Sequence, residues 1–164
     1  MPVASDSKNV REALRCAISG SGAHADTESV FASLNWKLAG KRPANSPHSI
    51  YQLLTHMLYW QDWVLEWLDG GDPPTPEHAS GSWPGKAGPS SRKEWDQAVQ
   101  RFRNGLAALT RHTRVADLSA KNGAKSRLEM LQTIASHNSY HAGQAVLIRQ
   151  QLGAWPPPTG SLTW

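Results

Sequence analysis

Two histidines four residues apart, His137 and His141, lie in a segment whose hydrophobic pattern predicts a long helix. Residues with this spacing project from the same face of an α-helix, on successive turns. Two imidazoles arranged in this way can bind one divalent metal ion. Alternatively, both are core histidines that hydrogen-bond to backbone carbonyls. The pair alone does not decide between the two interpretations.

The surroundings of each histidine on its predicted helix favour metal binding. At about 100° per residue, His141 lies within the apolar arc of the helix predicted over residues 126–152, and His137 lies at its edge. A second helix, predicted over residues 47–69, places His56 at the edge of its own apolar arc. Three histidines from two helices are therefore expected to face the interior, where they form a candidate metal site.

Three neutral imidazoles leave a coordination position open for water or substrate, which is typical of catalytic metal sites. The zinc-peptidase motif needs Glu directly after its first His, whereas this chain has Asn138. A di-iron bundle needs Glu-x-x-His pairs, and no acid follows Glu129 in the predicted helix. The site therefore favours direct activation of a nucleophile such as a thiol. A base supplied by His24, Tyr140 or a loop remains an alternative.

Uncharged side chains are expected to surround the three histidines. Asn138 and Gln144 are among the polar groups nearest the inner arcs, and Trp60 shares a predicted helix with His56. Core packing is the first interpretation of the tryptophans, and an aromatic pocket wall is the alternative. His24 begins another predicted helix and is an open candidate for a ligand. The predicted pocket comprises Trp60, Asn138, Gln144 and His24.

Hydrophobic periodicity predicts an all-α protein of four long helices and one short one, without a confident strand. The predicted helices span residues 6–18, 24–38, 47–69, 91–109 and 126–152. The Pro- and Gly-rich segment over residues 72–89 is too long for an ordinary turn, and we interpret it as a crossover along the bundle or a lid. Asn122-Gly123 indicates a turn and is compatible with a small hairpin.

Helix boundaries and domain limits follow from local signals. Ser91 and Ser126 are each followed three residues later by Glu, which predicts capping boxes at the starts of two helices. The short first helix and its glycine-rich linker are assigned to residues 1–22, and the helical bundle domain to residues 23–164. The two tryptophans of the proline-rich tail are expected to pack back on the body.

Composition limits the classes of function. The 164 residues, 39% hydrophobic with eight tryptophans, suffice for one domain with a sizeable core. No apolar run reaches 18 residues and no secretory signal is evident, so no membrane association is expected. With a single cysteine, Cys16, a cytoplasmic location is expected. The net charge of +4 comes from scattered basic residues, which disfavours nucleic-acid binding.

Several motifs stand in a recognisable order. Leu-Leu-Thr-His-Met-Leu occupies residues 53–58, and His-Asn-Ser-Tyr-His-Ala-Gly-Gln occupies residues 137–144. Leu-Ile-Arg-Gln-Gln-Leu-Gly follows at residues 147–153, and after a proline-rich tail come Thr163 and Trp164. This order resembles the DinB-like (DinB/YfiT) family.

The resemblance covers residues 24–164 and implies both a fold and a ligand set. It implies a four-helix bundle with an up-down-down-up course, in which the long loop is the crossover. The short helix predicted over residues 6–18 is then an extra N-terminal helix. It also implies that His56, His137 and His141 bind a divalent metal ion, zinc or nickel in particular.

The activity implied by the resemblance is less specific. Some relatives are thiol-dependent transferases or isomerases, so it implies an S-transferase that acts on a small molecule with a low-molecular-weight thiol. Many members are dimers, which implies a homodimer. A non-catalytic metal-binding stress or sensor protein, a metal-dependent hydrolase and a plain helical interaction module remain open alternatives.

Overall fold

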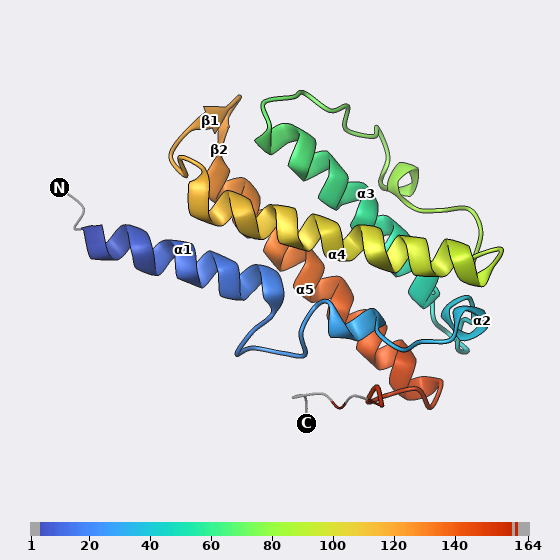
Figure 1. Ribbon diagram of the computed structural model, residues 1–164. Coiled ribbons are helices and arrows are strands. Elements are labelled where there is room, and N and C mark those ends of the chain that lie inside the picture. Colours follow the sequence, from blue (N-terminus) through green and yellow to red (C-terminus); the bar gives the residue numbers. More distant parts are fainter. Residues whose placement is uncertain (1–3, 159, 161–164) are drawn as a thin grey trace.

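Four long helices make up most of the molecule. The structure, a computed structural model, describes residues 4–158 and residue 160. The long helices are α1 (Ala4–Ser19), α3 (Ile50–Leu68), α4 (Arg92–Val115) and α5 (Arg127–Gln151), which form a bundle (Figure 1). The short elements are η1 (Ser29–Phe31), α2 (Trp36–Ala39), η2 (Ala79–Ser82), β1 (Lys121–Asn122) and β2 (Lys125–Ser126). The two strands pair antiparallel, which confirms the hairpin. The fold class expected from the sequence is confirmed.

Helices α3 and α4 pack side by side and run in the same direction. Tyr51 donates a hydrogen bond to Glu94 near the starts of both helices. Further along, Gln61 donates to the backbone carbonyl of Phe102. Because the residue numbers of both partners rise together, the two helices are parallel. A parallel pair requires a connection that returns along the bundle, and Figure 1 shows residues 69–91 making this crossover.

The other two helices run against this pair. Arg127, at the start of α5, donates to the carbonyl of Leu68 at the end of α3. Arg11 of α1 donates to the carbonyl of Thr113 in the last turn of α4. Helix α1 packs against both α4 and α5, and α3 packs against the same two helices. The course is therefore up-down-down-up.

Hydrogen bonds to α3 hold the crossover loop along its length. The indole N–H of Trp63 donates to the Pro74 carbonyl at 3.2 Å. The amide of Gln52 donates to the Pro84 carbonyl at 3.3 Å. Four anchors of this kind, including one from Ser49 and one from His56, fix a segment that has almost no regular structure. The loop is therefore a structured wall of the bundle.

The capping signals locate the helix that carries two of the histidines. Ser126 accepts from the backbone N–H of Glu129, and the Glu129 carboxylate accepts from the backbone N–H of Ser126. This reciprocal pair confirms the predicted capping box. The start predicted for the helix at residue 47 was too early, because α3 begins at Ile50 with Ser49 as its N-cap.

The helix predicted over residues 24–38 was wrong. The segment contains only η1 and α2, separated by Ser33, whose φ of 54° ends any right-handed helix. In a helix, the Val30 carbonyl would accept from a backbone N–H four residues later. Here it accepts from the guanidinium of Arg149 at 2.7 Å, and so does the Ala32 carbonyl at 3.1 Å. A tertiary hydrogen bond has replaced the helical one.

The first helix supplies one side of the bundle. Leu14 and Ile18 of α1 belong to the buried core together with residues of the other long helices. The division of the chain at residue 22 stays a prediction, although α1 shares its core with the rest. In the tail, Trp155 packs against the Arg149 guanidinium at 5.3 Å, whereas Trp164 lies outside the described residues. Among the described residues, no helix combines the length and apolarity that a membrane crossing requires.

Candidate metal centre

Three histidines from α3 and α5 converge at one point in the bundle. Each of His56, His137 and His141 offers one nitrogen, and these three atoms lie within 4.8 Å of one another. His56 Nε2 and His137 Nε2 are 3.2 Å apart. The helical spacing in α5 and the antiparallel contact of α3 with α5 produce this convergence. The structure thus brings together the three histidines that the sequence singled out.

Each imidazole uses its other nitrogen to contact an oxygen. His56 Nδ1 donates to the carbonyl of Ser82 at 3.3 Å. His141 Nδ1 donates to Gln144 Oε1 at 2.7 Å, and His137 Nδ1 faces Asn138 Oδ1 at 3.4 Å. Such outer partners fix the tautomer and the ring orientation of metal-binding histidines. All three rings are therefore oriented with Nε2 free.

The contact between the two Nε2 atoms requires a proton or a metal cation between them. A backbone carbonyl can only accept, so the proton of neutral His56 is on Nδ1 and its Nε2 carries a lone pair. With the same tautomer at His137, two lone pairs face each other at 3.2 Å. They repel unless a proton or a metal cation lies between them. Two nitrogens bound tetrahedrally at 2.0–2.1 Å would be about 3.3 Å apart, which fits the observed distance.

Burial keeps the three rings neutral. It lowers the pKa of His56 to about 4, with smaller contributions from His141 and His137. Burial also lowers the pKa of His137 to about 4, and it lowers the pKa of His141 despite the bond to Gln144. Neutral imidazole is the form that binds metal. At neutral pH the three rings are therefore ready to bind without first losing a proton.

Aromatic rings surround the histidines. Trp83, from the crossover loop, stacks on His56 with ring centroids 3.9 Å apart. Trp60 meets both His56 and His137 edge-on at 6.5 Å, and the ring of Tyr140 lies 5.0 Å from that of His141. The candidate ligand group among the described residues contains no Asp, Glu or Cys. The surroundings are therefore aromatic and uncharged, and no carboxylate contributes to the pKa shifts of the three histidines.

The other predicted pocket residues have different positions. Trp60, Asn138 and Gln144 contact the histidines as described above. His24 instead faces the carbonyl of Ala25 at 2.7 Å and Ser139 Oγ at 3.0 Å, a contact that ties the loop after α1 to α5. The structure therefore brings three of the four residues to the site and gives His24 other partners.

Two groups that contact the histidine site, the Ser82 carbonyl and His48, lie outside α3 and α5 and were not predicted from the sequence. The Ser82 carbonyl is a backbone group, so no residue type could have indicated it. His48, near the start of the helix predicted over residues 47–69, was not among the candidate site residues, yet its ring stacks on Trp83 at a centroid distance of 3.7 Å. Trp83 was the residue that could have indicated these contacts, because an isolated large aromatic side chain in a Pro- and Gly-rich loop predicts that this part of the loop packs on the body of the protein.

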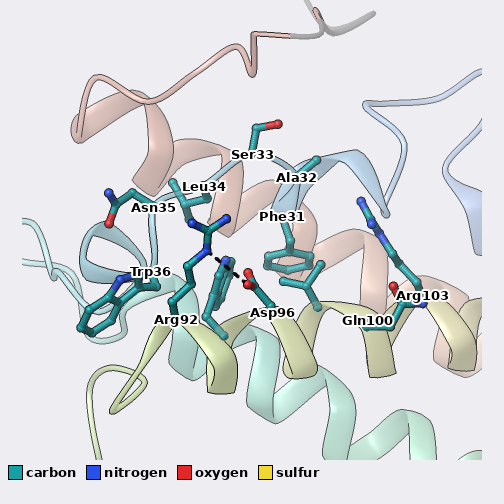
Figure 2. Close-up of a pocket in the computed structure, with 12 residues that line it drawn as sticks. Phe31, Ala32, Ser33, Leu34, Asn35, Trp36, Arg92, Asp96, Gln100 and Arg103 are labelled. Carbon is teal, nitrogen blue, oxygen red and sulfur yellow. Dashed lines mark hydrogen bonds and ion pairs between the residues drawn. The ribbon is translucent and has the colours of Figure 1, made fainter.

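Of the two cavities described next, only the smaller borders the histidine group. The larger, of about 610 Å³, lies between α4 and residues 31–36 and includes none of the three histidines (Figure 2). Its two arginines already have carboxylate partners, since Arg92 pairs with Asp96 at 3.4 Å and Arg103 with Glu28 at 3.0 Å. A smaller cavity of about 320 Å³ is lined by His48, Gln144 and Leu147, among others. It borders the histidine group because Gln144 accepts a hydrogen bond from His141, and because His48 stacks on Trp83, which in turn stacks on His56.

Comparisons with known proteins identify the family and agree with the fold. The sequence profile of the DinB superfamily matches residues 21–145. A conserved protein from Enterococcus faecalis has a similar structure, with a TM-score of 0.57 and 18% identity over 93% of this chain and 99% of that one. This likeness concerns the fold alone. No protein of curated function matches the chain.

Proposed function

The chain belongs to the DinB superfamily, and on this premise we propose that it is a metal-dependent enzyme of the thiol S-transferase type. His56, His137 and His141 are its proposed metal ligands, and zinc or nickel is the proposed ion. The observation that carries the proposal is the convergence of one nitrogen from each of three histidines, each of which contacts an oxygen through its Nδ1.

The residues around the site favour a thiol as the nucleophile. A bound divalent ion would supply a Lewis acid that lowers the pKa of a thiol or a water molecule in the open position. Water activation in a hydrolase is usually assisted by a carboxylate base, and the candidate ligand group among the described residues has none. A thiol is acidic enough to ionise at such a site without a base. This favours S-transfer over the hydrolase alternative.

The chain's own groups would exclude water and orient the rings. Trp60 and Trp83 cover two sides of His56, and the bond from His141 to Gln144 holds a proton on Nδ1. The cavity lined by His48, Gln144 and Leu147 is of a size suited to a small-molecule substrate. These features support a small-molecule reaction at the three histidines.

The homodimer belongs to the same proposal. Tyr140 and Leu147, which are 66% and 54% exposed, lie seven residues apart on one face of α5. Exposed apolar side chains on one helix face are suited to contact with a second copy. Light scattering of the wild type and of a Tyr140→Glu, Leu147→Glu double variant tests this. A wild-type monomer would contradict the dimer.

An assay of thiol transfer tests the activity. The protein, purified without a nickel column and then loaded with zinc or nickel, is mixed with an aryl halide and one of four thiols: glutathione, bacillithiol, mycothiol or coenzyme A. In the reaction the thiolate sulfur forms a bond to the aryl carbon and halide leaves. We expect metal-dependent turnover with at least one thiol, and its loss in His137→Ala.

Other outcomes would identify the alternatives. Metal-dependent ester hydrolysis without any thiol would indicate the hydrolase. Tight metal binding with neither reaction would indicate the non-catalytic sensor or stress protein. Histidines that bind no metal would contradict all three metal functions and leave the helical interaction module.

A further inference from the structure

The indole of Trp83 lies between two imidazoles. Its ring is nearly parallel to that of His48, with an interplanar angle of 9° and a centroid distance of 3.7 Å. It is equally parallel to the ring of His56, with an angle of 6° and a distance of 3.9 Å. The rings of Trp83 and His141 are nearly perpendicular, with centroids 5.8 Å apart. One loop residue therefore contacts two of the three candidate ligands.

The residue before Trp83 completes this contact. The carbonyl of Ser82, which is 4% exposed, accepts from His56 Nδ1 at 3.3 Å. The stacked indole fixes the plane of the His56 ring, and the carbonyl fixes which nitrogen points toward the other histidines. Together these contacts determine both torsions of a side chain that would otherwise sample several rotamers. Helix α5 supplies no such hydrogen bond to His56 Nδ1 within the described residues.

We propose that Trp83 is the positioning residue of the metal centre: sandwiched between His48 and His56, it holds His56 in the metal-binding orientation. The crossover loop thus forms part of the site as well as connecting α3 to α4. The proposal rests on the proposed function for the identity of the ligands, and it adds the element that positions the ligand from α3.

Stacking, and not hydrogen bonding, carries this role. The Trp83 indole N–H donates to no protein atom among the described residues, whereas the N–H of Trp63 donates to Pro74. Hydrogen-bonding partners that orient a metal-binding histidine typically contribute a factor of about 10 to 100 in metal affinity, and we expect the stack on His56 to contribute at the lower end of this range. A phenylalanine at position 83 retains a flat ring and is therefore expected to retain most of that contribution.

Cobalt binding to purified full-length variants tests the proposal. Co²⁺ affinity is measured from the visible d–d absorption in the wild type, Trp83→Ala and Trp83→Phe. Trp63→Phe is the matched control, because it removes another anchor of the same loop without touching the three histidines. We expect Trp83→Ala to weaken Co²⁺ binding about tenfold or more. We expect Trp83→Phe and Trp63→Phe to remain within about threefold of the wild type.

The outcomes separate this inference from the proposed function. Tight Co²⁺ binding by Trp83→Ala, or equal weakening in Trp63→Phe, would overturn the positioning role and leave the metal site intact. A wild type that binds no Co²⁺ would overturn both. If Trp83→Ala does not fold, judged by circular dichroism, His48→Ala and His48→Phe replace it. Weaker binding only in His48→Ala then supports the stack, and unchanged binding in both overturns it.

Discussion

The Nε2 atoms of His56 and His137 lie 3.2 Å apart, although 81 residues separate the two histidines in the sequence. The antiparallel packing of α3 on α5 brings them together, and the oxygen partners of their Nδ1 atoms leave both Nε2 atoms free. The packing of the two helices thus creates the pair of nitrogens on which the proposed metal site depends.

Gln144 is predicted to strengthen metal binding through His141. Its Oε1 accepts from His141 Nδ1 at 2.7 Å, which orients the ring and makes its Nε2 a better donor. Replacing Gln144 with Leu removes the acceptor while keeping a similar volume. We expect the affinity for Zn²⁺ to fall about tenfold or more, measured by competition with a chromogenic chelator.

The control for this variant lies on the same helix. Gln150 is exposed, and Gln150→Leu makes the same chemical change away from the histidines. Its affinity should match that of the wild type. Equal affinities in all three proteins would show that the Gln144 contact does not act on the metal site.

The metal-free protein should lose stability in mild acid. Burial lowers the pKa of His56 and His137 to about 4 in the folded state, whereas an unfolded histidine titrates near 6.5. Between these values the unfolded chain binds more protons, so stability is complete above about pH 6.5 and falls as the pH drops toward about 4. Urea unfolding at several pH values measures the slope.

A double variant provides the comparison for this pH dependence. In His56→Gln, His137→Gln, both titrating groups are absent and the loss of stability between pH 6.5 and pH 4 should be smaller. The same slope in both proteins would show that other groups cause the acid sensitivity.

Gly105 is predicted to be essential for the close packing of α4 on α3. A Cβ at this position would overlap the amide group of Gln61, which is fully buried and donates to the Phe102 carbonyl. Gly105→Ala should therefore destabilise the fold by about 1–3 kcal/mol, as measured by urea unfolding. The same change at Gly143 meets no atom within 4 Å and should stabilise α5 by up to about 1 kcal/mol. Equal stabilities of both variants would contradict this packing.

Periodicity was sufficient to find the candidate ligands. An i, i+4 pair on an inner helical face and one histidine on a second inner face are local patterns, and the bundle converts them into a cluster. The length of the segment over residues 72–89 indicated a crossover or a lid, and the parallel course of α3 and α4 follows from the first of these two interpretations.

The features that the sequence did not predict depend on tertiary contacts. Residues 24–38 have a helical pattern, but the buried Arg149 takes the carbonyls of Val30 and Ala32 that a helix would use. Arg149 lies more than a hundred residues away in the sequence, so no local pattern in residues 24–38 could indicate that its guanidinium would replace the helical hydrogen bonds. The contact of His56 with the Ser82 carbonyl could not be predicted from residue types either, because every residue has a backbone carbonyl.

Metal content of the purified protein tests the central claim most directly. Protein prepared without a nickel column is analysed by elemental mass spectrometry beside the single variants His56→Ala, His137→Ala and His141→Ala. We predict about one equivalent of zinc or nickel in the wild type and a marked loss in each variant. Less than about half an equivalent in the wild type, unchanged in the three variants, would contradict the metal site.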